Sequence, residues 1–204
     1  MPLIDLTHTF GPNMPNYPGD PAPTLEQIAH IGPDQLNMYC LCSGTHVGTH
    51  MDAPLHMIVG GRFICDVPAE SCFGRGRLID ARGRNAITPD LLAPADVESG
   101  DIVLVLTGWY HRFSDPAYYR DFPEVTPEFA RALVNAGASI IGLDTPSPDR
   151  SPFEVHKILL SAPVLIIENL TNLEPLVGIG PFDIVALPAK LQADAAPVRV
   201  MAIY

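Results

Sequence analysis

Three histidines and one aspartate lie close together in the segment 46–56: His46, His50, Asp52 and His56. Imidazole nitrogens and carboxylate oxygens are the ligands that Zn²⁺ and Mn²⁺ take in proteins. If His46, His50 and Asp52 bind one ion, a coordination position stays open for water, which is typical of a catalytic rather than a structural metal site. We therefore predict a divalent metal here, Zn²⁺ first and Mn²⁺ as the alternative.

The local pattern leaves alternatives for this cluster. Its first two histidines are four residues apart, so one helical turn could place both on one face, but Gly48 and Pro54 favour a short loop. Cys40 and Cys42 could add thiolate ligands, although their alternation fits a buried strand better. Surface or hydrogen-bonded core histidines without a metal are the remaining interpretation.

The segment resembles the signature His-x-Gly-Thr-His-x-Asp-x-Pro-x-His of the metal-dependent cyclase family, which includes bacterial kynurenine formamidases and isatin hydrolases. Every specified position of the signature is present: His46, Gly48, Thr49, His50, Asp52, Pro54 and His56. Further similar segments occur along nearly the whole chain, at 5–7, 14–15, 18–21, 107–109, 142–147, 188–190 and 194–199. The resemblance implies a swivelling α/β fold that assembles as homodimers or homotetramers.

The resemblance also implies a second metal site, shared by Asp52 with a later histidine and glutamate. His156 and Glu168 have the required separation of twelve residues. Glu168 follows the apolar run 164–167, where a carboxylate is costly unless it is paired or metal-bound. An ordinary salt bridge is the alternative for Glu168, and acid–base catalysis is a further role in relatives with one metal. We expect one or two ions per subunit.

His56 lies outside the predicted ligands of the first ion. Because imidazole titrates near neutrality, we predict that His56 is catalytic and carries a proton to the leaving nitrogen, with Glu168 as the other candidate. The alternative is that His56 only orients the ligands. Water activated by the metal would then attack an amide or ester carbonyl.

Aromatic residues near the matching segments could stack on an aryl substrate. The candidates for substrate binding are Tyr17, Phe63 and Trp109, with Met57 as a further contact, and simple packing is the alternative for each. The expected substrate is a small aryl formamide such as N-formylkynurenine, or a cyclic amide such as isatin. The segment 149–152 departs from the formamidase pattern, which argues against N-formylkynurenine but not against hydrolysis. A lactone hydrolase or cyclase, and a non-catalytic metal- or ligand-binding protein, are the alternatives.

Charge and composition exclude several other classes. The chain has 12 Lys and Arg against 23 Asp and Glu, which argues against nucleic acid or an anionic membrane as partner. No apolar run reaches the roughly 20 residues of a membrane span, and no signal peptide is recognised. Four cysteines do not demand a disulfide framework, so we expect a cytoplasmic protein. Charged residues are only 17% of the chain, which favours a buried interface in a homo-oligomer.

The elements that position these residues follow from prolines and apolar runs. With 22 prolines, a long helical bundle is excluded. We predict one domain over residues 1–204, α/β with a swivelling β/α/β-type arrangement, a central mixed sheet and few helices. The expected strands are 35–41, 77–80, 102–106, 139–143, 164–167, 184–187 and 198–203. A helix is expected at 128–135, capped by Thr126 and stopped by Gly137, and a shorter one from Thr88.

Overall fold

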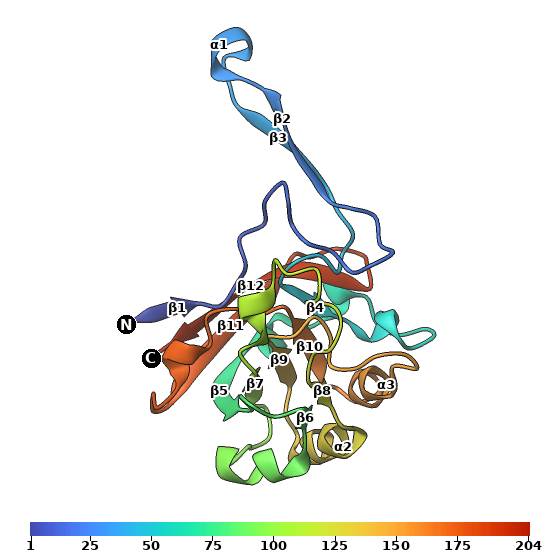
Figure 1. Cartoon of the computed structure of the whole chain (residues 1–204), viewed down its shortest axis with the longest axis vertical. Helices are drawn as coiled ribbons and strands as arrows, with labels where there is room; N and C mark the ends of the chain where they lie inside the picture. The colour runs from blue at the N-terminus through green and yellow to red at the C-terminus, as the bar shows by residue number, and fades with distance from the viewer.

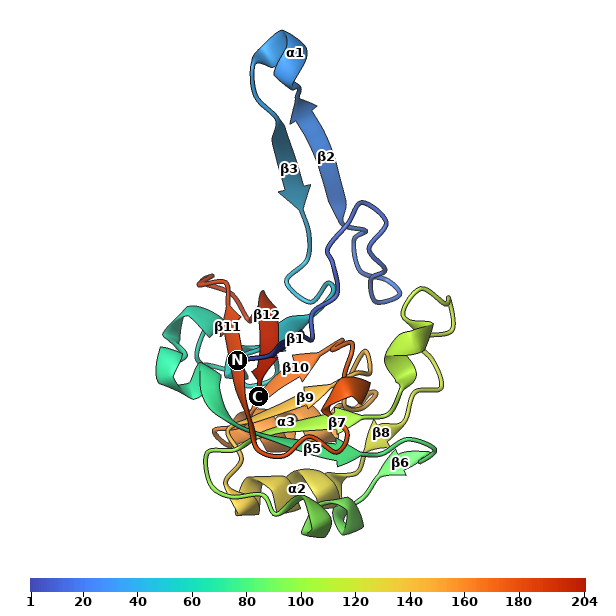
Figure 2. The same cartoon turned by 90° about the vertical axis from the view of Figure 1, so that its left-hand side faces the viewer.

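The computed structural model describes residues 1–204, and its centre is one sheet of eight strands in the order β1-β12-β11-β5-β7-β9-β10-β4. An additional pairing of β4 with β12 closes seven of them into a ring, with β1 attached outside to β12 (Figures 1 and 2). The strands are β1 (Leu3–Asp5), β4 (His50–Asp52), β5 (Phe73–Asp80), β7 (Ile102–Leu106), β9 (Ile140–Leu143), β10 (Leu165–Glu168), β11 (Phe182–Pro188) and β12 (Ala195–Ile203).

The sheet is mixed, as the sequence predicted. Strands β5, β7, β9 and β10 run parallel to their neighbours within this group. The pairings of β11, β12 and β4 are antiparallel. A mixed α/β fold with few helices is therefore confirmed, whereas the swivelling arrangement stays a prediction.

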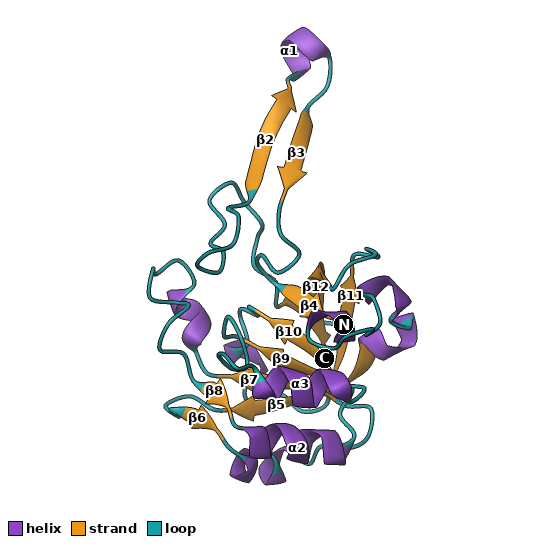
Figure 3. Cartoon of the chain, turned by 90° about the vertical axis from the view of Figure 1, so that its right-hand side faces the viewer, coloured by secondary structure: helices purple, strands orange, loops and turns teal.

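Two helices cover the outer face of the parallel strands, α2 (Pro127–Ala136) and α3 (Glu154–Ser161) (Figure 3). Thr126 accepts a hydrogen bond from the amide of Phe129, and Gly137 ends α2 with a positive φ of 80°. Strand β7 is buried on both faces, since Leu104 joins the core inside the ring and Val105 packs under the helices. This is why its sequence is apolar at every position.

A hairpin arm projects away from this body (Figures 1 to 3). It consists of β2 (Thr24–Ala29), α1 (Ile31–Asp34) and β3 (Met38–Cys42). The strand expected at 35–41 thus begins three residues later, after α1 and a left-handed Gln35. The expectation that Cys40 and Cys42 are buried is wrong, because every residue of β3 is exposed on the arm.

The remaining elements are short. The small strands β6 (Ala86–Ile87) and β8 (Glu124–Val125) pair with each other. The expected helix after Thr88 is only a three-residue 3₁₀ turn, η4 (Pro89–Leu91). Pro94 has no N–H to continue an α-helical ladder at this point, so the turn cannot lengthen. The other 3₁₀ turns are η1 (Pro54–His56), η2 (Ile64–Asp66), η3 (Ala69–Cys72), η5 (Ala93–Ala95), η6 (Trp109–Arg112) and η7 (Glu174–Leu176). None of the helices has the length and apolar character needed to cross a bilayer.

Candidate active site

Strand β4 brings two of the predicted ligands onto one face of the sheet. His50 and Asp52 are two residues apart in this strand, so both side chains point the same way while Met51 enters the core. On one side, β4 pairs with β10, which places Glu168 directly opposite His50. On the other side, Ala195 of β12 lies opposite Asp52. The short strand β4 therefore collects residues from distant parts of the chain.

The segment before β4 is a loop, as Gly48 suggested. Gly48 has φ +71°, and a Cβ there would collide with the side chain of Met14. The positive φ favours glycine at this position, because residues with a side chain rarely adopt it. The loop turns His46 back toward Asp52, so that His46 Nδ1 lies 3.0 Å from Asp52 Oδ1.

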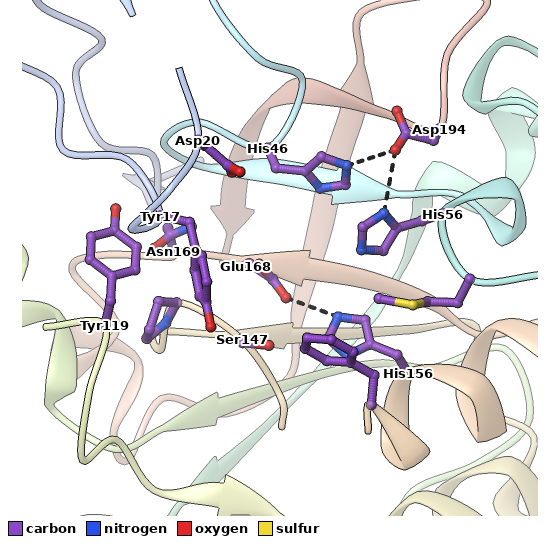
Figure 4. A pocket seen from close by; sticks show the side chains of 13 residues that line it. Tyr17, Asp20, His46, His56, Tyr119, Ser147, His156, Glu168, Asn169 and Asp194 are labelled. Carbon is purple, nitrogen blue, oxygen red and sulfur yellow. Dashed lines mark hydrogen bonds and ion pairs between the residues drawn. The ribbon is translucent and has the colours of Figure 1, made fainter. Parts of the chain in front are cut away.

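Two buried carboxylates form the centre of the site. Asp52 Oδ1 lies 3.4 Å from His50 Nε2, and Asp52 Oδ2 lies 3.8 Å from His156 Nε2. Glu168 is 3.3 Å from each of the same two imidazole nitrogens, through Oε2 to His50 and Oε1 to His156. The structure thus brings together all five predicted ligands, as the close-up in Figure 4 shows for His46, His156 and Glu168.

Unpaired buried atoms show that this donor set fits a cation. His50 Nε2 and both carboxylate oxygens of Asp52 are buried without a hydrogen-bond partner. Leaving such groups unpaired in the interior is costly, and a bound cation removes the cost. Two groups of residues each place their ligand atoms within 4.8 Å of one another. One group is His46, Asp52 and His56, and the other is His50, Asp52 and Glu168, so that Asp52 belongs to both.

In each histidine that is a predicted ligand, one ring nitrogen lies within hydrogen-bond distance of an oxygen atom. His50 Nδ1 lies 2.8 Å from the carbonyl oxygen of Gly48, and His156 Nδ1 lies 2.5 Å from Asp149 Oδ1. His46 Nε2 lies 2.9 Å from Asp194 Oδ2. In each ring the other nitrogen faces Asp52 or Glu168. Such partners orient histidine ligands and fix their tautomer in metal sites.

The pKa values of the buried histidines and carboxylates also favour cation binding at this site. Burial lowers the pKa of His50 and of His156, but the carboxylates close to each ring outweigh it and raise both pKa values to about 10. Burial opposes the ionisation of Asp52, yet its histidine neighbours hold its pKa well below the usual range. The buried carboxylates thus keep their charge by holding protons on the imidazoles, and a divalent ion would displace those protons.

A cavity of about 310 Å³ opens above these residues. Its polar side is formed by His46, His56, His156 and Glu168, together with the lining residues Asp20, Ser147, Asn169 and Asp194. The remaining lining residues are aromatic or apolar: Tyr17, Met57, Tyr119, Pro146 and Phe153. Phe153 lies beside His156, with ring centroids 5.6 Å apart. Tyr17 and Tyr119 meet edge to face, with ring centroids 5.6 Å apart. No lysine or arginine lines the cavity.

Comparison with known proteins identifies the family. Residues 4–150 match the model of the family described as "Putative cyclase". The chain belongs to the cyclase family. It is 31% identical to the kynurenine formamidase of Salinibacter ruber (strain DSM 13855 / M31), over 98% of this chain and 97% of the relative.

Two solved structures extend the comparison with this cyclase-family chain. A potential metal-dependent hydrolase with cyclase activity has a TM-score of 0.83 and 32% identity, covering 98% of this chain and 96% of its own. Isatin hydrolase A from Labrenzia aggregata, bound to benzyl benzoate, has a TM-score of 0.85 and 25% identity, covering 99% and 93%. Metal dependence is thus named in a relative and matches the ligand groups of this cyclase-family protein.

The predicted substrate contacts of the cyclase-family chain separate into two groups. Tyr17 and Met57 line the cavity, whereas Phe63 and Trp109 are not among its lining residues. The indole N–H of Trp109 instead donates to the backbone oxygen of Tyr118 at 2.8 Å, which holds its own loop in place. Phe63 is half-buried and directly precedes η2.

Sequence reasoning missed several residues of the site. They are Tyr119, Ser147, Phe153, Asn169, Asp149 and Asp194. Ser147 and Asp194 lie in segments that resemble the family, but no local spacing connects them with the histidine cluster. Asp149 belongs to the segment that departs from the formamidase pattern, so the resemblance gave no signal for it.

Proposed function

We propose that this protein is a metal-dependent hydrolase that cleaves a small aryl or cyclic amide. The observation that carries the proposal is the fully buried Asp52 carboxylate, which has no hydrogen-bond partner and lies among three histidines, two of which line a partly aromatic cavity. The curated kynurenine formamidases that resemble the chain support an amidohydrolase acting on C–N bonds other than peptide bonds. The protein would act as one domain over residues 1–204.

We propose two neighbouring ions, with ligands divided differently from the two compact sets: His50 instead of His56 would join His46 and Asp52, and His156 instead of His50 would join Asp52 and Glu168. His46, His50 and Asp52 would hold the first, and Asp52, His156 and Glu168 the second, with Zn²⁺ favoured over Mn²⁺ because imidazole and carboxylate suit it. A divalent ion in this place supplies Lewis acidity and lowers the pKa of a bound water. The chain's own part is to fix the ligands and to offer aromatic rings that an aryl group can contact.

Proton transfer would fall to His56 and Glu168. Burial, together with the neighbouring His46 and His156, lowers the pKa of His56, and the charge of Asp52 only partly opposes this shift. His56 is therefore neutral near pH 7 and can accept a proton before passing it to the leaving nitrogen. Glu168, whose carboxylate faces both the cavity and two imidazoles, would serve as the second proton-transfer group.

The cavity favours an aryl substrate without a carboxylate. Tyr17, Tyr119 and Phe153 offer ring faces and edges for an aromatic group. Because no lysine or arginine lines the cavity, an amino-acid carboxylate such as that of N-formylkynurenine has no cationic anchor there. An uncharged aryl formamide or a cyclic amide of the isatin type fits this lining better.

Metal content and turnover, measured together, test the proposal. We expect stoichiometric divalent metal by mass spectrometry in the wild type, with hydrolysis of formanilide or isatin and slower turnover of N-formylkynurenine. Asp52→Asn should lose both metal and turnover. Asp183→Asn, which changes an exposed carboxylate on β11, is the matched control and should keep both.

Three outcomes would overturn the proposal. A wild type that hydrolyses these amides equally well after exhaustive chelation would exclude the metal mechanism. Metal binding with no turnover of any amide would favour the non-catalytic binding protein. Turnover of an aryl lactone with none of the amides would favour the lactone hydrolase.

We also propose a homo-oligomer, supported by the hairpin arm. An isolated two-stranded hairpin is marginally stable in water, yet this one extends away from the body (Figure 2). Its exposed apolar side chains are Ile28, Ile31, Leu36, Met38, Tyr39 and Leu41. Burying them against a second copy would stabilise the arm. The element of the metal and the cytoplasmic location stay predictions.

A further inference from the structure

One oxygen of Asp194 contacts two of the site histidines. Asp194 Oδ2 lies 2.9 Å from His46 Nε2 and 3.3 Å from His56 Nδ1. Figure 4 shows the carboxylate between the two rings, on the side away from Glu168 and His156. The other oxygen, Oδ1, accepts a hydrogen bond from the hydroxyl of Thr45 at 3.1 Å. Asp194 therefore joins a predicted metal ligand to the predicted proton carrier.

The backbone fixes this carboxylate in place. The carbonyl oxygen of Asp194 accepts a hydrogen bond from the amide of Ala53 at 2.9 Å, directly between Asp52 and the turn η1 that carries His56. The next residue, Ala195, pairs with Asp52 across β12 and β4. Asp194 is therefore bonded through its backbone to the same short segment that carries the histidines, which fixes where its side chain begins, and Thr45, His46 and His56 hold the carboxylate itself.

The chemistry of the contact decides which nitrogens carry hydrogen. A carboxylate only accepts hydrogen bonds, so His46 Nε2 and His56 Nδ1 must both be protonated to donate to it. A neutral His46 then presents the lone pair of Nδ1 toward Asp52 Oδ1, 3.0 Å away. Two lone pairs at that distance repel each other unless a proton or a metal cation lies between them, so Nδ1 is the nitrogen that is free to bind a metal. A neutral His56 is left with Nε2 as its free acceptor.

We propose that Asp194 is a positioning residue that fixes the tautomer and ring orientation of both His46 and His56. One carboxylate thus presets a metal ligand and the group that takes up the proton. This inference rests on the proposed function for the role of His56, but the tautomer itself is a property of the folded protein.

Asp149 provides a matched comparison. It accepts from His156 Nδ1 and from the backbone amide of Val155, so it holds one ligand of the second predicted ion. It has no contact with His56 among the hydrogen bonds of the structure. Replacing Asp149 should disturb metal binding without changing the His56 tautomer, whereas replacing Asp194 should change both.

The test is ¹⁵N NMR of the histidine rings in the zinc-loaded protein, with His56 assigned through its loss in His56→Gln. In the wild type, His56 should show protonated Nδ1 and unprotonated Nε2. Asp194→Asn should convert His56 to a mixture of tautomers and weaken metal affinity about 10- to 100-fold. It should also lower kcat at saturating metal. Asp149→Asn should weaken metal affinity but leave the His56 signals unchanged.

The wild-type spectrum alone can overturn the proposal, even if a variant fails to fold. A His56 that carries its proton on Nε2 would exclude the assigned role, and so would unchanged His56 signals in a folded Asp194→Asn. These outcomes differ from failure of the proposed function, which would appear as absent metal or absent hydrolysis regardless of the tautomer.

Discussion

His56 lies close enough to the other histidines either to bind a metal ion or to transfer a proton. Its ring centroid lies 4.2 Å from that of His46 and 5.7 Å from that of His156, and it can form a ligand set with His46 and Asp52. We nevertheless assign the ions to the other histidines, because His46, His50 and His156 each have a ring nitrogen within 4.0 Å of Asp52, whereas His56 forms such a pair only with Asp194. This assignment gives His56 proton transfer without metal binding, whereas Glu168 would do both.

His56→Gln is therefore expected to keep the full metal content of the wild type while kcat falls about 10²- to 10⁴-fold, the usual contribution of a general acid or base. The measurements are metal content after gel filtration and kcat at saturating substrate. Loss of one equivalent of metal in this variant would place His56 among the ligands instead. Normal turnover would remove it from proton transfer.

The sequence predicted the site residues that are neighbours along the chain and missed those that are distant along it. His46, His50 and Asp52 could be selected because they lie within one short segment. Asp194 could not, since it reaches His46 only through the pairing of β12 with β4. Asp149 reaches His156 because the first turn of α3 folds back on it through the amide of Val155. Sequence spacing cannot predict these hydrogen-bond partners, because only the tertiary fold brings them to the histidines.

At the scale of elements, a buried carboxylate ties two strand ends together. Asp144 follows β9 and accepts hydrogen bonds from the backbone amides of Thr107 and Gly108, just after β7. Burial raises the pKa of Asp144 to about 6, although these hydrogen bonds partly oppose the shift. The folded protein therefore holds this proton more tightly than the unfolded chain does.

The raised pKa of Asp144 makes the free energy of unfolding depend on pH. Between about pH 4 and pH 6 the native state binds more protons at Asp144, so its contribution to stability falls as the pH rises. Below about pH 4, the tighter proton binding of Asp144 contributes its full stabilisation to the folded state. A pKa difference of about two units corresponds to roughly 3 kcal/mol, which is lost as the pH rises through about 6. In urea titrations at several pH values, Asp144→Asn should lack this part of the pH slope. Parallel slopes for variant and wild type would contradict the assignment.

The sequence predicted most of the sheet and α2, and the failures have physical causes. Apolar runs gave β7 and β9 because these strands are buried on both sides. Strand β4 was missed, since three residues containing a histidine and an aspartate have no strand pattern of their own. It is a strand because β10 and β12 pair with it on either side. The arm strand β3 was misjudged because alternation indicates a strand but not whether anything covers it.

At the scale of the whole molecule, the arm predicts the oligomeric state. We expect the wild type to be a dimer or tetramer by light scattering, and Tyr39→Asp combined with Leu41→Asp to dissociate it, because two charges would replace apolar side chains in the interface. Val59→Asp, at a fully exposed apolar residue of the body, is the control and should leave the mass unchanged. A monomeric wild type would contradict the proposal.

Metal removal should weaken the fold as a whole, because the site lies where the ring closes. Strand β4 contributes His50 and Asp52, and β10 contributes Glu168, so a bound ion would fasten the strands whose pairing completes the ring. At a free metal concentration 100 times Kd, binding stabilises the native state by about 2.7 kcal/mol. For a chain of this size, chelation should then lower Tm by about 5 to 10 °C. Differential scanning calorimetry with and without chelator measures this shift, which Asp183→Asn should retain and Asp52→Asn should lose. Equal melting temperatures for chelated and metal-loaded wild type would show that the ring closes without help from an ion.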